Sequence, residues 1–137
     1  MEGRKFLNPA KVLAARTGEE YGRAAVGRAY YALMLECREA FQRWGFVIPR
    51  RDNVHTFLRL RFCRNGNHTL ETIGDALTDL GQLRNTADYE TSALGLFTAN
   101  VTAQRAIQKA QDTIALLDGI NTDSNQQNAA IAALRQA

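Results

Sequence analysis

The stretch Leu83-Arg84-Asn85-Thr86-Ala87-Asp88-Tyr89 ends a helix that the apolar spacing predicts to begin near Thr69. The apolar residues before it recur three or four positions apart: Leu70, Ile73, Leu77 and Leu80. A rotation of about 100° per residue carries this stripe onto Arg84 and Asp88, on a face that we expect to be buried. Because an unpaired buried charge costs several kcal/mol, the pair should be matched to each other, to another helix or to a ligand.

The length and composition of the chain are those of one domain. Its 137 residues are 45% hydrophobic, enough to bury a core. The formal net charge of +3 suits an anionic partner but does not require one. No apolar signal segment opens the chain, and the longest apolar run, residues 29–35, is too short for a bilayer. We therefore expect a soluble cytoplasmic protein without membrane contact, with Cys37 and Cys63 as free buried thiols.

Start and stop signals divide the chain into four or five helices without a strand. The expected helices cover residues 9–16, 18–44, 54–63, 69–89 and 99–118. The signals that bound them are Asn8 before Pro9, Thr17 with Glu20, Gly45, Asn53, Asn67 or Thr69, Thr98, and Gly119. Residues 121–137, rich in Asn, Gln and Ala, are expected to form a short peripheral helix from Ser124 or a mobile tail. They stand apart from a helical domain of residues 1–120.

The long helix ending near Trp44 carries apolar residues on two sides. Its main stripe is Val26, Ala29, Tyr30, Leu33, Met34, Cys37, Ala40, Phe41 and Trp44. A second side gathers Tyr21, Ala25, Arg28, Tyr31, Ala32 and Leu35. This helix is therefore expected at the centre of a bundle or at a subunit interface. Tyr30 is assigned to core packing, whereas Arg28 and Tyr31 can either pack at an interface or line a cleft.

Positive charge is concentrated between residues 43 and 64. Six arginines stand there against one acid, a local balance of +5 that exceeds the +3 of the whole chain: Arg43, Arg50, Arg51, Arg59, Arg61 and Arg64. The segment is expected to be either a solvated face or a footprint for an RNA backbone.

Three common kinds of site are not expected. The segment 22–28 superficially matches a phosphate-binding loop, but it lacks the lysine, the hydroxyl residue after it and a preceding strand. The two cysteines and two histidines have no zinc-site spacing. The only serines, Ser92 and Ser124, lie in connectors outside any nucleophile elbow. We expect neither a metal nor a cofactor.

Two short motifs resemble the HEPN family of small all-helical domains. Arg28-Ala-Tyr-Tyr-Ala32 lies on the long helix, and Arg84-Asn-Thr-Ala-Asp-Tyr89 ends a later one. Their order, spacing and helical setting agree with the family over roughly residues 9–120. The resemblance implies an up-and-down bundle of four to five helices that commonly forms a homodimer, with the late arginine of both subunits facing a shared cleft. Many relatives are metal-independent ribonucleases of toxin–antitoxin and phage-defence systems, often encoded beside a nucleotidyltransferase antitoxin; others only bind nucleotide or RNA.

The chain departs from the ribonuclease signature of this family. That signature places a histidine about four to six positions after the arginine, and here the fifth position after Arg84 holds Tyr89. Metal-independent RNA cleavage needs a proton acceptor and a proton donor, work suited to a group titrating near neutrality. A tyrosine, with an ordinary pKa near 10, is a poorer base. His55 is the histidine expected nearest the site, since His68 lies in a turn.

The resemblance assigns roles to residues of both motifs. Arg84 is expected to bind phosphate, with Asp88 and Tyr89 completing a catalytic site. Contacts to RNA or nucleotide are expected from Arg28, Tyr31, Arg50, Arg51, His55, Arg59 and Asn85. Two other readings stay open: a non-catalytic helical dimer that binds a protein partner through exposed Tyr21, Tyr31 and Leu35, and a small-nucleotide sensor with a closed pocket between helices.

Overall fold

The computed structural model describes residues 1–51, 53–92, 94–97 and 99–136, and these residues are largely helical, without a strand among them. The helices are α1 (Leu7–Ala14), α2 (Glu19–Arg43), α3 (Val54–Cys63), α4 (His68–Tyr89), α5 (Leu94–Phe97), α6 (Val101–Thr122) and α7 (Ser124–Gln136). A 3-10 helix, Gly3–Phe6, precedes α1. The predicted all-α bundle is confirmed. No helix in these ranges is both long and apolar enough to cross a membrane.

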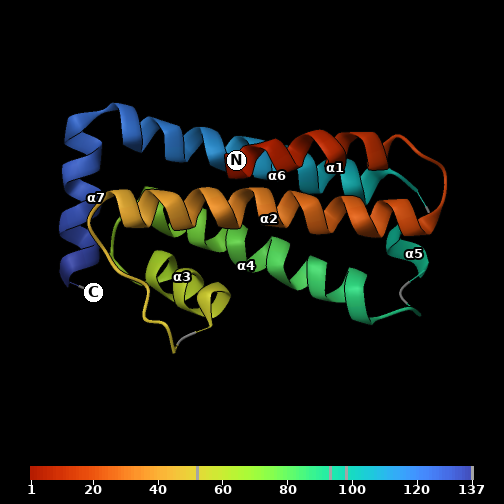
Figure 1. The fold of residues 1–137 in the computed structure, drawn as a ribbon, viewed down its shortest axis with the longest axis horizontal. Helices are drawn as coiled ribbons and strands as arrows, with labels where there is room; N and C mark the ends of the chain where they lie inside the picture. Colours follow the sequence, from red (N-terminus) through yellow and green to blue (C-terminus); the bar gives the residue numbers. More distant parts are fainter. Residues whose placement is uncertain (52, 93, 98, 137) are drawn as a thin grey trace.

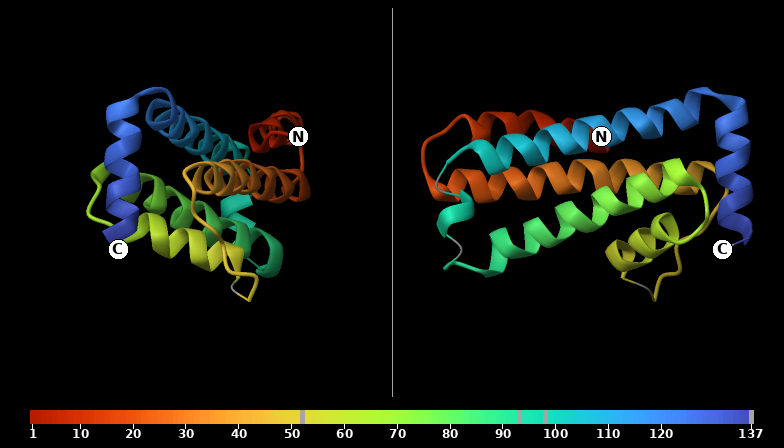
Figure 2. Two further views of the ribbon diagram at one scale, coloured as in Figure 1. Left: turned by 60° about the vertical axis from the view of Figure 1, so that its left-hand side comes forward. Right: turned by 180° about the vertical axis from the view of Figure 1, so that it is seen from behind.

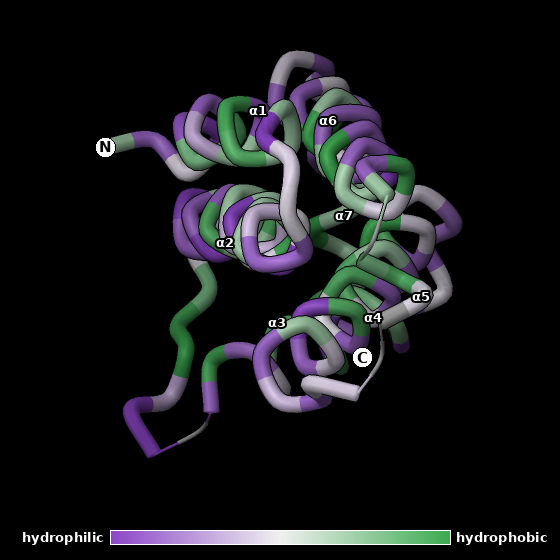
Figure 3. The backbone as a smooth tube through the Cα atoms, turned by 90° about the vertical axis from the view of Figure 1, so that its right-hand side faces the viewer, coloured by the Kyte–Doolittle hydropathy of each residue, from purple (hydrophilic) through white to green (hydrophobic). Residues whose placement is uncertain are grey.

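Helix α2 runs through the middle of the bundle, as Figure 1 shows. Helices α1 and α6 lie on one side of it, and α3 and α4 lie on the other (Figures 2 and 3). The short α5 lies at one end of the bundle, and α7 crosses the other end (Figure 1). The central position predicted for the long helix is therefore confirmed. The start of α3 and the C-terminal half of α4 come to lie on the same side of α2.

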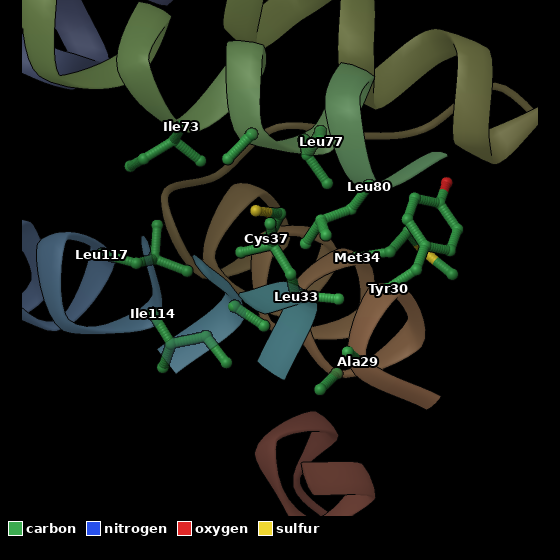
Figure 4. Close-up of a cluster of buried hydrophobic side chains, with 14 of the residues drawn as sticks. Ala29, Tyr30, Leu33, Met34, Cys37, Ile73, Leu77, Leu80, Ile114 and Leu117 are labelled. Atoms are coloured by element: carbon green, nitrogen blue, oxygen red, sulfur yellow. The ribbon is translucent and has the colours of Figure 1, made fainter. Parts of the chain in front are cut away.

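The core forms where α2, α4 and α6 meet. Figure 4 shows Leu33 and Cys37 of α2 among side chains of the other two helices. Fully buried alanines line α2 at positions 25, 29, 32 and 40. Because alanine is small, neighbouring helices can pack closely against α2 on more than one side. Because small and large buried residues alternate along α2, both of its apolar sides pack against neighbouring helices. This packing places α2 at the centre of the bundle.

Two predicted helix starts are wrong. Helix α1 begins at Leu7 and not after Asn8, because the 3-10 turn of residues 3–6 runs directly into it. Helix α2 is preceded by Gly18, whose φ of 132° lies where glycine is favoured, and no side chain caps the helix. Thr17 therefore does not form the expected capping box. The acids at positions 19 and 20 do lie in the first turn, where the helix dipole favours them.

The other boundary signals have mixed outcomes. Asn53 and Asn67 cap α3 and α4 by accepting hydrogen bonds from backbone N–H groups of the first turn, as predicted. Gly45 follows the end of α2 with a φ of 95°, also as predicted. Gly119 does not end its helix, because α6 continues to residue 122. Thr98, the expected cap of that helix, lies outside the described residues.

The C-terminal segment is a packed helix, the first of the two forms expected for it. Ala130 and Leu134 of α7 are fully buried. Arg61 donates a hydrogen bond from Nη2 to the carbonyl oxygen of Leu134 at 2.6 Å. Trp44 donates from Nε1 to Asn121 Oδ1 at 3.0 Å, where the chain turns from α6 toward α7. Residues 121–136 are therefore part of the bundle and not a mobile tail.

Alanine substitutions at Gly74 and Gly27 form a matched test of the α3–α4 packing. A Cβ at Gly74 would lie 2.7 Å from backbone atoms of Phe62 and Cys63, so Gly74→Ala must push α3 away from α4. We expect it to lower the free energy of unfolding by about 1–3 kcal/mol. A Cβ at Gly27 would meet no other element within 4 Å, and Gly27→Ala should add roughly 0.5–1 kcal/mol. Urea denaturation followed by circular dichroism measures both, and equal effects would contradict this packing.

Candidate functional site

A pocket of about 210 Å³ lies between α2, α3 and α4. On α4, the pocket begins where the apolar stripe ends. Leu77 of that stripe lines the pocket, and the following turns of α4 contribute polar side chains. The side chains around it that carry chemistry are Tyr30, His55, Arg59, Gln82, Arg84 and Asn85. They come from three helices far apart in the sequence, so the fold itself assembles the pocket.

Arg84 lies at the centre of the contacts around this pocket, with a side chain 21% exposed. Its Nη2 donates a hydrogen bond to the Tyr31 hydroxyl at 3.1 Å. Its guanidinium carbon lies 5.2 Å from the ring centroid of Tyr31 and 5.8 Å from that of Tyr30. These are cation–π distances, and partial burial strengthens such contacts. Two aromatic rings and one hydroxyl therefore position the guanidinium.

Asp88 pairs with Arg84 from the rim of the pocket. Asp88 Oδ2 lies 3.0 Å from Arg84 Nε, but the Nε–H is not aligned with that oxygen, so the contact is an ion pair without a hydrogen bond. The Asp88 side chain is 39% exposed. The prediction that both charges are buried is therefore wrong for Asp88, which lies on the exposed side of the last turn of α4, and Arg84 is only partly buried. An exposed i,i+4 ion pair contributes only about 0.3–0.5 kcal/mol to the stability of a helix. Stabilisation of α4 is therefore a weak reason for the Arg84–Asp88 pair.

His55 reaches the pocket from the first turn of α3. The Asn53 side chain accepts a hydrogen bond from the His55 backbone N–H at 3.0 Å, which fixes that turn. The His55 ring stacks on Tyr30, with centroids 5.6 Å apart and planes inclined by 20°. Its Nδ1 lies 2.7 Å from the Tyr30 hydroxyl. Tyr31 meets the same ring edge-on at 6.0 Å. The imidazole is thus held on two sides by α2.

The surroundings of the pocket shift the pKa values of both His55 and Tyr30. Burial lowers the pKa of His55 below its ordinary 6.5, and the positive charge of Arg84 lowers it further. Burial raises the pKa of Tyr30 to about 12, although the Arg84 guanidinium acts in the opposite direction. At neutral pH the pocket therefore holds an uncharged imidazole beside an un-ionised phenol.

Tyr30 belongs to the site, although the sequence pattern predicts only a core residue at this position. It is 5% exposed and lies on the main apolar stripe, as predicted for a core residue. Figure 4 shows, however, that its hydroxyl points away from the core cluster. A Cβ at Gly81 would lie 3.4 Å from its ring, so the glycine leaves room for the tyrosine against α4. The residue type itself indicated a further role for Tyr30, because a buried tyrosine hydroxyl usually requires a hydrogen-bond partner.

The structure brings some of the expected site residues together and leaves others apart. Those at the pocket or in direct contact with Arg84 are Tyr31, His55, Arg59, Asn85 and Asp88. Those outside it are Arg28, Arg50, Arg51 and Tyr89, all of which are exposed. The Tyr89 side chain is 75% exposed at the end of α4. The arginines at positions 50 and 51 lie in the loop that leads into α3.

The thiols stand apart from this chemistry. Cys37 is completely buried, and burial raises the pKa of its thiol. Cys63 is only partly buried, contrary to expectation, and its Sγ lies 3.6 Å from Thr78 Oγ1. Both cysteines are free. Across the described ranges, no three His, Cys, Asp or Glu residues form a group that could hold a metal ion.

The chain is thus an all-α protein with a polar pocket built from arginine, tyrosine and histidine. Comparison with known proteins gives no match: no family model, curated protein or solved structure is significantly similar to this chain. Its function must therefore be argued from the pocket and from the two motifs that contribute to it.

Removal of the Arg84 charge should raise the pKa of His55. Burial and the guanidinium both lower that pKa, and Arg84→Gln removes the second cause while keeping a polar side chain. An NMR titration of the histidine Cε1 protons measures the shift, with the two signals distinguished through His68→Gln. A His55 pKa that is the same in the wild type and in Arg84→Gln would contradict the placement of these side chains in one pocket.

Proposed function

We propose that this chain is a HEPN-type protein that binds RNA through the pocket around Arg84, in a toxin–antitoxin or phage-defence setting. The observation that carries the proposal is the contact between the two motifs. Tyr31 of the first motif and Arg84 of the second are 53 residues apart and share a hydrogen bond. His55 and Asn85 line the same pocket. A cation, a neutral imidazole and amide groups in one polar pocket are suited to a phosphodiester and its ribose.

Arg84 is the phosphate-binding residue of this proposal. The described residues offer its Nη1 no hydrogen-bond partner, whereas Nη2 is held by Tyr31. A guanidinium that is positioned but not saturated can donate to a phosphate oxygen in a charge-assisted hydrogen bond. Arg59 lines the pocket as a second cation. The exposed Arg50 and Arg51, in the loop before α3, extend this positive charge and are assigned to the RNA backbone.

The proposed assembly is a homodimer in which the Arg84 pockets of both subunits face a shared cleft. A paired cleft doubles the positive charge that meets the strand, and charge density of this kind favours RNA association. Exposed Arg28 and Tyr89 are assigned to the walls of that cleft. A nucleotidyltransferase-type antitoxin is the proposed protein partner.

Two features of the surface favour RNA over the other readings. A protein-interaction module would expose Tyr21, Tyr31 and Leu35, but all three are partly buried and Tyr31 is engaged by Arg84. A small-nucleotide sensor would need a pocket of roughly 300 Å³ or more to enclose its ligand. The pocket at Arg84 holds about 210 Å³, which suits one phosphate and ribose of a longer strand, and the larger hollow of about 580 Å³ between α4 and α6 is an open groove.

The Arg84→Ala variant should bind single-stranded RNA about tenfold or more weakly, because it loses a charge-assisted hydrogen bond. Lys11→Gln is the matched control, since it removes one positive charge from an exposed position on α1, and α1 lies across α2 from the helices α3 and α4 that line the pocket (Figure 1). Fluorescence anisotropy between about 50 and 200 mM salt measures both variants, and wild-type affinity should fall steeply over this range. Equal affinities of the two variants, or binding indifferent to salt, would refute the proposal.

A further inference from the structure

The pocket contains a histidine, His55, although the sequence motif has none at the expected position after Arg84. We infer that His55, oriented by Tyr30, takes the 2′-hydroxyl proton of RNA bound at Arg84 and so makes the protein a metal-independent endoribonuclease. This inference rests on the proposed function, since it requires RNA at the Arg84 pocket. It moves the catalytic base from the end of α4 to the start of α3, 29 residues earlier in the sequence than Arg84.

The position of His55 meets the geometric requirements of a catalytic base. It lines the same pocket as Arg84, so a phosphate on the guanidinium would place its ribose near the imidazole. The ring is stacked on Tyr30, bordered by Tyr31 and fixed at its backbone by Asn53. A base held in this way loses little entropy when the substrate arrives. Tyr89, in contrast, is 75% exposed and contributes nothing to the pocket wall.

The contact with Tyr30 determines which ring nitrogen can act. Tyr30 Oη lies 2.7 Å from Nδ1, and no hydrogen bond to Nε2 is formed by any residue that the structure describes. With the proton on Nδ1, this N–H donates to the Tyr30 oxygen and leaves the Nε2 lone pair available to the substrate. When Nε2 takes a proton, the Nδ1–H of the imidazolium keeps the same acceptor. Tyr30 is therefore a positioning residue for both states of the ring.

The charged and titratable groups around His55 favour its neutral form. Tyr30 and Tyr31 face it from α2, Arg59 shares the pocket from α3, and Arg84 faces it from α4 with Asp88 as its ion-pair partner. Burial and Arg84 lower the His55 pKa, so the base form predominates at neutral pH. A neutral imidazole can accept a proton, which is what proton abstraction requires.

The reaction is an internal transphosphorylation. The 2′-oxygen attacks the adjacent phosphorus as its proton moves to His55 Nε2, and Arg84 stabilises the charge on the non-bridging oxygens. The bond between phosphorus and the 5′-oxygen breaks. The leaving 5′-oxygen receives the proton from His55, directly or through water, which restores the neutral ring. The products are a 2′,3′-cyclic phosphate and a 5′-hydroxyl, and no further reactant is consumed.

The test uses the full chain, a defined single-stranded RNA and a chelator. Wild-type protein should cleave the RNA and leave 2′,3′-cyclic ends, and its rate should rise with pH through the NMR-measured pKa of His55. His55→Gln should still bind RNA in an Arg84-dependent manner, but at saturating RNA it should cleave the bound strand about a hundredfold or more slowly. Added imidazole should restore cleavage to a folded His55→Ala variant. His68→Gln, which changes the exposed histidine at the start of α4, should cleave normally.

Each other outcome overturns the inference in a recognisable way. If His55→Gln cleaves as fast as the wild type, His55 is not the base, although RNA binding at Arg84 stands. If the wild type binds RNA in a salt-sensitive, Arg84-dependent manner but never cleaves it, the protein is a binding module and this inference fails alone. If the wild type does not bind RNA, the proposed function fails together with the inference.

Discussion

The burial of α2 on several sides is the constraint on which the rest of the structure depends. A helix enclosed by neighbours can carry a polar group only where that group finds a partner. Glu36 is 6% exposed, and it accepts hydrogen bonds from the Arg4 backbone N–H and side-chain Nε, both at 2.9 Å. Arg4 also pairs with Asp118 of α6 at 2.7 Å. The single buried carboxylate of α2 thereby ties the N-terminal turn and α6 to the central helix.

The pocket follows from the same constraint on the other side of α2. The hydroxyl of Tyr30, nearly buried with its ring, must find a partner, and His55 supplies it at 2.7 Å. Two glycines of α4 make this geometry possible. Gly74 lets the end of α3 lie close against α4, and Gly81 leaves space for the Tyr30 ring. The packing that completes the core therefore also holds an imidazole beside a guanidinium.

Sequence patterns identified the helices well because helix formation is governed by local spacing and capping. The apolar stripes, Asn53 and Asn67 all had the roles expected of them. Contacts between residues far apart in the sequence were harder to predict. Tyr30 lies on a core stripe, and a stripe specifies the face of a helix but not where the end of a long side chain points. The approach of His55 depends on how α3 packs against α4, and the exposure of Asp88 depends on which side of the last turn of α4 faces the neighbouring helices. Neither is encoded in local spacing.

The central claim is that Tyr30, His55 and Arg84 form the site that meets RNA. The most direct measurement is an NMR titration of labelled protein with a short single-stranded RNA whose 2′-hydroxyls are methylated, which prevents cleavage. The account predicts that the largest shifts occur at the Arg84 Nε–H and the His55 ring and spread to neighbours along the pocket. Shifts that cluster instead on the groove between α4 and α6, around Asp79 and Lys109, with Arg84 and His55 unmoved, would contradict it.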